Sequence, residues 1–156
     1  MGLGLYLEIQ RGGKGMSDTE FVSDMKKTAA CCCHMAKGTV SSTSDKHADG
    51  YTDTYLGDSW FSSVDTVVAL KKCFNANFIG VIKTNHSRYP KKWLEETMKE
   101  WPPSSHLVLQ AEYEGVVMFA CGYKYNKRKV CSFIFTKGAG HTEEGQRYKA
   151  RWKDAN

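Results

Sequence analysis

The chain has 156 residues, of which 41% are hydrophobic and 25% charged, and its net charge at pH 7 is +5. This composition is typical of a globular domain and excludes a low-complexity or disordered polymer. No apolar run approaches the roughly 18 residues that cross a bilayer, and three of the six cysteines are consecutive, which is unlike a secreted disulfide scaffold. The sequence therefore predicts a nuclear or cytoplasmic protein that is neither secreted nor membrane-bound.

The N-terminal third predicts a strand, a helix and a loop. Residues 3–9 alternate Leu and Ile with Gly, Tyr and Glu, and this period of two is typical of a strand. Ser17 with Glu20 three residues later forms a capping box, so a packing helix is expected from there to Gly38. Residues 39–53 are mostly Ser, Thr, Asp, Gly and His, and predict a surface loop.

The next stretch predicts a strand, a helix and a second strand. Residues 54–57 indicate a short buried strand that ends at Asp58. A helix over 64–73 follows, capped by Ser62 with Asp65 and broken at Asn75, and then an apolar strand over 78–83. Because open α/β sheets bind ligands at the carboxyl ends of their strands, Asp58 is a candidate ligand of a divalent cation. The alternative is that Asp58 only favours the start of the following helix.

The second half of the chain predicts one helix and then strands. Pro90 opens a helix that runs to Glu100. From His106 the pattern changes to strands joined by tight turns, which indicates a three-stranded antiparallel meander. Close to residue 156, basic residues alternate with Tyr148 and Trp152, as in an amphipathic strand. The expected strands are 107–113, 116–124, 130–136 and 147–153.

Residues 58–63, Asp-Ser-Trp-Phe-Ser-Ser, resemble the Asp-Asn-Trp/Phe-Phe-Thr/Ser-Ser segment of piggyBac-type transposases. The helix 64–73, the strand 78–83, the helix 90–100 and the hairpin 123–129 follow in the order of that family. The resemblance implies a ribonuclease-H-like core that cuts and joins DNA with two Mg²⁺ or Mn²⁺ ions. It also implies that the aspartate opening the segment is the second of three catalytic aspartates.

The same resemblance implies a partial α/β domain. Residues 1–83 would form the ribonuclease-H-like part, 84–142 a β-rich antiparallel insertion, and 143–156 a truncated strand and tail. A two-metal centre needs several carboxylates, and no acid stands where the first or third should be. Asp58 would then be a vestigial acid and a partial cation site, and the chain a fragment without catalysis of its own. The alternative is a piece of an active transposase whose other acids lie in flanking sequence.

Two basic clusters predict nonspecific contact with DNA phosphates. The alternative for them is an ordinary solvated turn and tail. If DNA or protein binding is the present function, in a domesticated interaction module, these clusters matter and Asp58 does not. The predicted DNA-binding residues are Lys124, Lys127, Arg128, Lys129, Arg147, Lys149 and Arg151.

Two further motifs suggest other chemistry. Gly57-Asp58-Ser59 is similar to the turn that carries the nucleophile of certain esterases, but no histidine has an acid at the spacing such an enzyme needs. Cys31–Cys33 with His34 suggests zinc. Successive helical residues point about 100° apart, so at most two could reach one ion, and packing as small apolar groups is the alternative.

Overall fold

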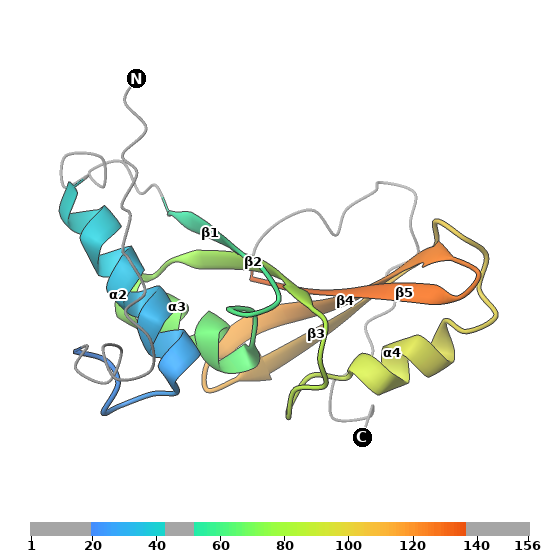
Figure 1. Cartoon of the computed structure of the whole chain (residues 1–156), viewed down its shortest axis with the longest axis horizontal. Coiled ribbons are helices and arrows are strands. Elements are labelled where there is room, and N and C mark those ends of the chain that lie inside the picture. The colour runs from blue at the N-terminus through green and yellow to red at the C-terminus, as the bar shows by residue number, and fades with distance from the viewer. Residues whose placement is uncertain (1–19, 43–51, 137–156) are drawn as a thin grey trace.

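The computed structural model describes residues 20–42 and 52–136, which form a mixed α/β arrangement of helices and one five-stranded sheet (Figure 1). The elements predicted over residues 3–9 and 147–153 lie outside the described residues. No helix in the described ranges is long and apolar enough to cross a membrane. The helices are α2 (Lys27–Ser42), α3 (Val64–Phe74) and α4 (Lys91–Thr97), and the strands are β1 (Thr54–Gly57), β2 (Asn77–Ile82), β3 (His106–Tyr113), β4 (Val116–Asn126) and β5 (Lys129–Phe135).

The sheet has the strand order β1-β2-β5-β4-β3. β1 and β2 are parallel and are connected through α3, which confirms the predicted strand-helix-strand unit. β3, β4 and β5 form the predicted antiparallel meander, and β5 pairs antiparallel with β2. The two halves therefore share one sheet, and the division of the chain into a ribonuclease-H-like part and an insertion stays a prediction.

Local hydrogen bonds explain where α3 begins and ends. Ser63 is the N-cap, and its Oγ accepts a hydrogen bond of 3.1 Å from the backbone N–H of Thr66. The prediction that Ser62 caps this helix is therefore wrong by one residue. At the other end Asn75 has φ 49°, the left-handed conformation that commonly closes a helix, and its N–H donates to the carbonyl of Lys71.

The first described helix differs from its prediction at both ends. α2 begins at Lys27 and continues through Gly38 to Ser42, whereas the sequence pattern places it between residues 17 and 38. Phe21 and Met25 lie in turns before the helix and pack against the core from there. Glycine costs a helix about 1 kcal/mol relative to alanine. Because α2 packs along α3, tertiary contacts offset that cost and the helix does not stop at Gly38.

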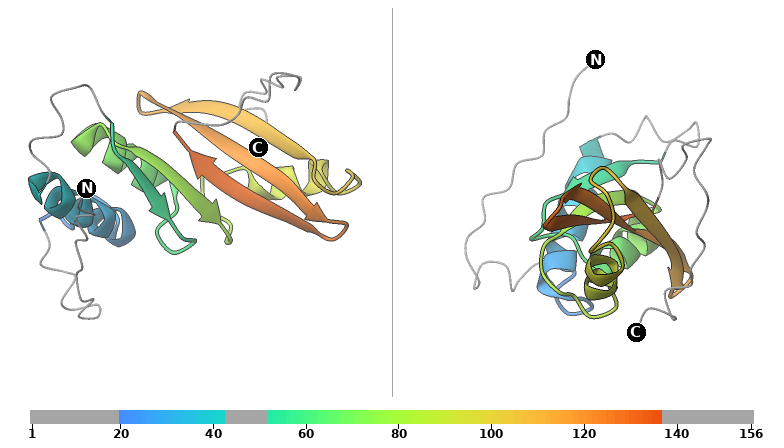
Figure 2. Two further views of the ribbon diagram at one scale, coloured as in Figure 1. Left: turned by 90° about the horizontal axis from the view of Figure 1, so that it is seen from above. Right: turned by 90° about the vertical axis from the view of Figure 1, so that its right-hand side faces the viewer.

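The core lies between the sheet and the helices α3 and α4, which are below it in Figure 1. Seen from above, the strands lie side by side with α4 behind them (Figure 2). The turn after β1 lies very close to Gly57 and Gly80, which pair across β1 and β2. A Cβ atom on Gly80 would lie 2.0 Å from Ser62 Oγ and 2.6 Å from a ring carbon of Phe78. The turn after β1 therefore packs directly on the β2 backbone.

Apolar side chains also extend across the opposite face of the sheet, which no helix of the described ranges covers. Leu56 pairs with Ile79, Ile79 with Phe135, and Phe135 with Phe119. The two phenylalanine rings stack with centroids 5.3 Å apart. At the end of this row, on β1, Leu56 is 80% exposed. β1 was expected to be a buried strand, and this expectation is wrong because β1 is the last strand of the described sheet.

Candidate functional site

Asp58 lies directly after β1, at the carboxyl end of a strand, as predicted. β1 and β2 are parallel, so Lys83, which follows β2, lies at the same end of the sheet as Asp58. Asp58 is exposed, and its Oδ1 accepts hydrogen bonds from the backbone N–H groups of Trp60 at 2.9 Å and Phe61 at 3.4 Å. This carboxylate therefore orders the turn that leads into α3.

The serines after Asp58 hold the same turn. Ser62 is fully buried, and its Oγ donates to the carbonyl of Asp58 at 2.6 Å. Thr66 Oγ1 donates to the carbonyl of Phe61 at 2.7 Å. Each hydroxyl satisfies a backbone carbonyl at the start of the helix, so residues 58–63 form one rigid turn. The position of the Asp58 carboxylate is fixed by this turn.

The described ranges, residues 20–42 and 52–136, contain no group of three or more His, Cys, Asp or Glu side chains placed to hold a metal ion. Two-metal phosphoryl transfer needs a set of oxygen ligands around both ions. Asp58 would supply one such carboxylate. The acids in this part of the chain therefore do not fit a two-metal centre.

The cysteine cluster on α2 is built for packing. Cys33 is fully buried in the core, and all six cysteines of the chain are free thiols. Burial raises the pKa of Cys32 and of Cys33 to about 12. Zinc sites use several such ligands around one ion, and the described ranges bring no three His, Cys, Asp or Glu side chains together to hold one.

Ser59 is not activated by a histidine within the described ranges. His86 Nε2 lies 3.1 Å from Thr84 Oγ1, so this imidazole contacts the loop after β2. A serine nucleophile needs a base within hydrogen-bond reach. The esterase interpretation therefore gains no support from the geometry.

Lys124 does not belong to the basic surface that the sequence predicts. It is 2% exposed, and its Nζ donates a hydrogen bond of 2.6 Å to the carbonyl of Lys99, just after α4. Side chains alternate along a strand, and Lys124 shares a face with Ala120 and Gly122, which pack toward α4. The prediction of a DNA contact at Lys124 is wrong because this ammonium group satisfies a backbone carbonyl near a helix end.

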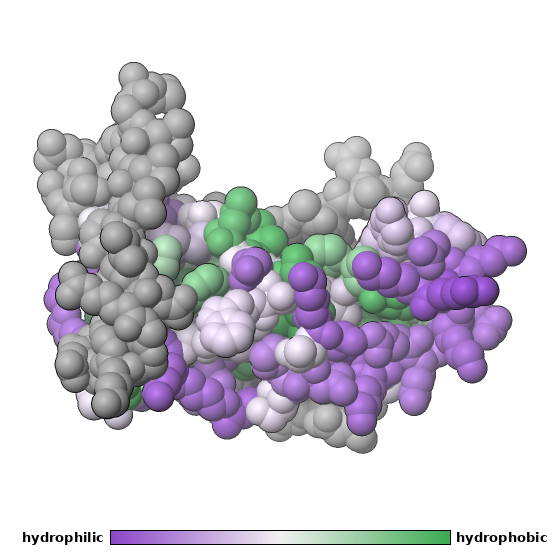
Figure 3. All heavy atoms as spheres, viewed as in Figure 1, coloured by the Kyte–Doolittle hydropathy of each residue, from purple (hydrophilic) through white to green (hydrophobic). Residues whose placement is uncertain are grey.

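The other three cations of this hairpin are exposed. We refer to residues 125–129 as the hairpin tip. Lys127, Arg128 and Lys129 form no ion pair with any acid of the described ranges. Asn126 Oδ1 accepts hydrogen bonds of 2.9 Å from the N–H groups of Arg128 and Lys129, which fixes the turn. Hydrophilic side chains gather at the end of the molecule where α4 and this hairpin lie (Figure 3).

An aromatic side chain accompanies these cations. Tyr125 is 62% exposed, and Lys129 Nζ lies 5.7 Å from the centroid of its ring. Cations beside an exposed ring are the groups that contact phosphates and bases. The remaining predicted DNA-binding residues, Arg147, Lys149 and Arg151, lie outside the described residues.

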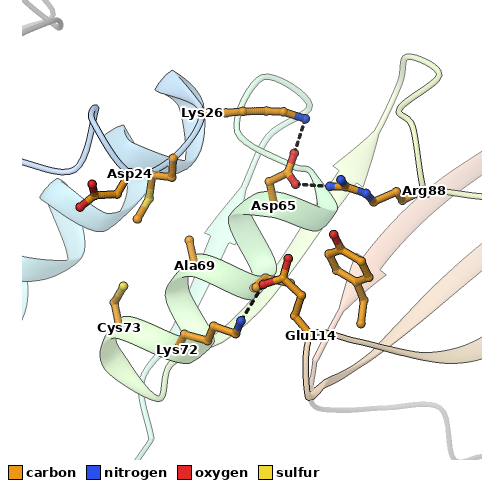
Figure 4. A pocket seen from close by; sticks show the side chains of 11 residues that line it. Asp24, Lys26, Asp65, Ala69, Lys72, Cys73, Arg88 and Glu114 are labelled. Atoms are coloured by element: carbon orange, nitrogen blue, oxygen red, sulfur yellow. Dashed lines mark hydrogen bonds and ion pairs between the residues drawn. The ribbon is translucent and has the colours of Figure 1, made fainter.

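No sequence pattern indicates the pocket of about 400 Å³ that lies on the helix side (Figure 4). Asp65 of α3 lies between Lys26, at 2.6 Å, and Arg88, at 2.8 Å. The Arg88 guanidinium also lies 4.8 Å from the ring centroid of Tyr113. Asp65 was interpreted as part of a helix cap, and nothing in the sequence around Arg88 indicates this contact.

A second ion pair closes the other side of the pocket. Lys72 Nζ lies 2.6 Å from Glu114 in the turn between β3 and β4. This hydrogen bond, together with one from Tyr113, lowers the pKa of Glu114. With Asp24, the pocket has three acids and three cations. The balance of charge gives it no preference for a polyanion, so it is a less suitable DNA site than the hairpin tip.

Comparison with known proteins finds a likeness in structure and no match in sequence. No protein family matches the sequence, and no curated protein matches it. The chain is similar to a solved cryo-EM structure of a piggyBac transposase synaptic complex with hairpin DNA, with a TM-score of 0.46 and 17% sequence identity. The match covers 70% of this chain and 22% of that chain, so this chain spans under a quarter of its structural neighbour.

Proposed function

We propose that this chain is a piggyBac-type transposase-derived domain that binds DNA through its hairpin tip and does not cleave DNA alone. The observation that carries the proposal is the group of three exposed cations, Lys127, Arg128 and Lys129, without an acidic partner in the described ranges. Unpaired cations on a fixed turn bind phosphates by releasing counterions, without regard to base sequence. The net charge of +5 favours the same association.

The transposase origin is supported by the motif at residues 58–63, in which three polar residues each stabilise the local structure. Asp58 orders the turn, Ser62 packs against Gly80, and Ser63 caps α3. The turn places the acid at the carboxyl end of a strand, where α/β sheets bind ligands. A ribonuclease-H-like core, with Asp58 as its second acid, belongs to this proposal.

The binding test measures the affinity of the purified chain for a labelled duplex of about 20 base pairs between about 50 and 200 mM salt. We expect the triple variant Lys127→Ala/Arg128→Ala/Lys129→Ala to bind more weakly and to lower the slope of log K against log salt by roughly 0.9 per lost contact. Lys27→Ala/Lys72→Ala/Lys92→Ala is the matched control, since it removes three exposed lysines elsewhere. Equal losses in both variants would contradict a role specific to the hairpin tip.

A separate measurement tests the absence of cleavage. The chain is incubated with supercoiled plasmid and with either Mg²⁺ or Mn²⁺. We expect no nicking above the background of the Asp58→Asn variant, since one carboxylate does not hold two ions. Metal-dependent nicking that disappears in Asp58→Asn would show that further acids complete the site.

A further inference from the structure

The carboxyl ends of β1 and β2 and the hairpin tip lie at the same end of the sheet. Gly57 pairs with Gly80, and Gly80 with Ile134. Followed from Ile134 toward its first residue, β5 leads to the tip at residues 127 and 128. Figure 2 shows β1 and β2 pointing toward the end where β4 turns into β5. At about 3.3 Å per residue and 4.8 Å per strand, Asp58 and the tip are separated by roughly 20 Å.

Two large aromatic side chains are exposed at this end. Trp60, two residues after Asp58, is 66% exposed, and Tyr125 is exposed to a similar degree. Both lie on ordered backbone: the Trp60 N–H is bonded to Asp58 Oδ1, and Tyr125 lies in β4. Tryptophan buries a large area when a partner covers its ring, and the ordered turn holds Trp60 where a partner can reach it.

We propose that Trp60 and Tyr125 are stacking platforms for the bases of single-stranded DNA. The inference rests on the proposed DNA-binding function and names its substrate as an unpaired strand. Lys83 after β2 and the three cations of the tip would contact the backbone of the strand between and beyond the two rings. Aromatic platforms set among cations bind single strands of any sequence, because every base has a π-face.

Single-stranded DNA fits this end of the sheet better than duplex does. In a duplex the base faces are stacked on one another, so Trp60 would find no surface to cover. The cations of the hairpin tip need only phosphates, which a duplex and a single strand both carry. The two rings therefore add affinity only for a strand whose bases are unpaired.

The test compares Trp60→Leu with Trp60→Phe in binding oligo-dT of about 12 nucleotides. Leucine keeps an apolar side chain without a π-face, whereas phenylalanine keeps the ring. We expect roughly tenfold weaker binding for Trp60→Leu and less than about twofold for Trp60→Phe, with duplex binding unchanged in both. Because Trp60 is exposed, thermal unfolding should not change by more than about a degree, which verifies that both variants are folded.

Two outcomes separate failure of this inference from failure of the proposed function. Unchanged oligo-dT binding in Trp60→Leu, with loss of duplex binding in the hairpin-tip triple variant, overturns the stacking role alone. Absence of DNA binding by the unsubstituted chain overturns both. Leu56→Ala is the control for a general apolar surface, since Leu56 is the most exposed large apolar residue of the described ranges. A loss in Leu56→Ala equal to that in Trp60→Leu would also overturn stacking, because leucine has no π-face.

Discussion

The two halves of the sheet are stabilised in different ways. The β1–α3–β2 unit depends on short contacts: a buried serine against a glycine backbone, and a turn held by side-chain hydrogen bonds. The β3–β4–β5 meander depends on long, regular pairing, with β3 and β4 matched from His106–Tyr123 to Tyr113–Val116. The first half therefore depends on the contacts of one turn, whereas the second depends on strand pairing along its length.

The same difference separates the two groups of proposed functional residues. Asp58 and Trp60 are fixed by the turn, and their positions change if that turn changes. The hairpin tip is fixed by Asn126 and by the pairing of β4 with β5, and its cations extend from this frame into solvent. Substitutions of the residues that hold the turn after β1 should thus alter structure and function together, whereas substitutions of the three tip cations should alter binding alone.

The largest effect is expected at Gly80. Gly80→Ala would place a Cβ atom 2.0 Å from Ser62 Oγ, and Ser62 is held by its bond to the Asp58 carbonyl, so the turn must move. Overpacking of this kind costs about 3 kcal/mol. Urea unfolding monitored by circular dichroism measures the loss.

Gly115→Ala in the turn between β3 and β4 is the matched control. Gly115 has φ 78°, but nothing lies within 4 Å of its Cβ position, so only backbone strain of about 1 kcal/mol is expected. A cost at Gly115 equal to that at Gly80 would show that the two turns are not held by different means.

The next largest effect on stability distinguishes a lysine and an arginine of the same hairpin. Lys124→Ala removes a buried stem and the donor to the Lys99 carbonyl, which should destabilise the fold by about 2 kcal/mol. Arg128→Ala, at the exposed tip, should change stability by less than about 0.5 kcal/mol but weaken duplex binding. Thermal melts and anisotropy titrations on both variants measure this, and reversed effects would place Lys124 on the surface.

The sequence predicted the meander and the strand-helix-strand unit because both depend on local patterns. Alternation in 107–136 gave each strand within about two residues, and Asn75 marked the end of α3. Lys124 was misplaced although its pattern was informative: it continues the buried row of Met118, Ala120 and Gly122. The charge of Lys124 predicts exposure, whereas its place in the strand predicts burial.

Other features depend on contacts that no local pattern contains. α2 passes Gly38 because α3 lies beside it, and Arg88 reaches Asp65 only after the loop before α4 folds back. The exposure of Leu56 follows from the position of β1 at the end of the described sheet order. The position of Asp58 after a strand is predictable, because a strand pattern precedes it and a capped helix pattern follows it in the sequence.

A moderate effect is expected at Asp58, where structural and metal roles can be separated. Asp58→Ala loses the acceptor for the Trp60 and Phe61 N–H groups and should cost about 1 kcal/mol. Asp58→Asn keeps an oxygen acceptor and should cost only a few tenths of a kcal/mol. Denaturant unfolding of both variants measures the costs. Equal losses would indicate that the charge, and not the turn, matters for stability.

The smallest effect concerns Glu114, whose pKa lies below its usual 4.5 because Lys72 donates to it. A carboxyl group with a lowered folded pKa adds stability above its unfolded pKa, and this contribution is lost as the pH falls through the folded value. The unfolding midpoint of the unsubstituted chain should therefore fall slightly more below about pH 4.5 than that of Lys72→Ala. NMR titration of the Glu114 carboxyl carbon gives the direct measurement, with a higher pKa expected in Lys72→Ala. An unchanged pKa would mean that the ion pair does not persist in solution, as is common for exposed pairs.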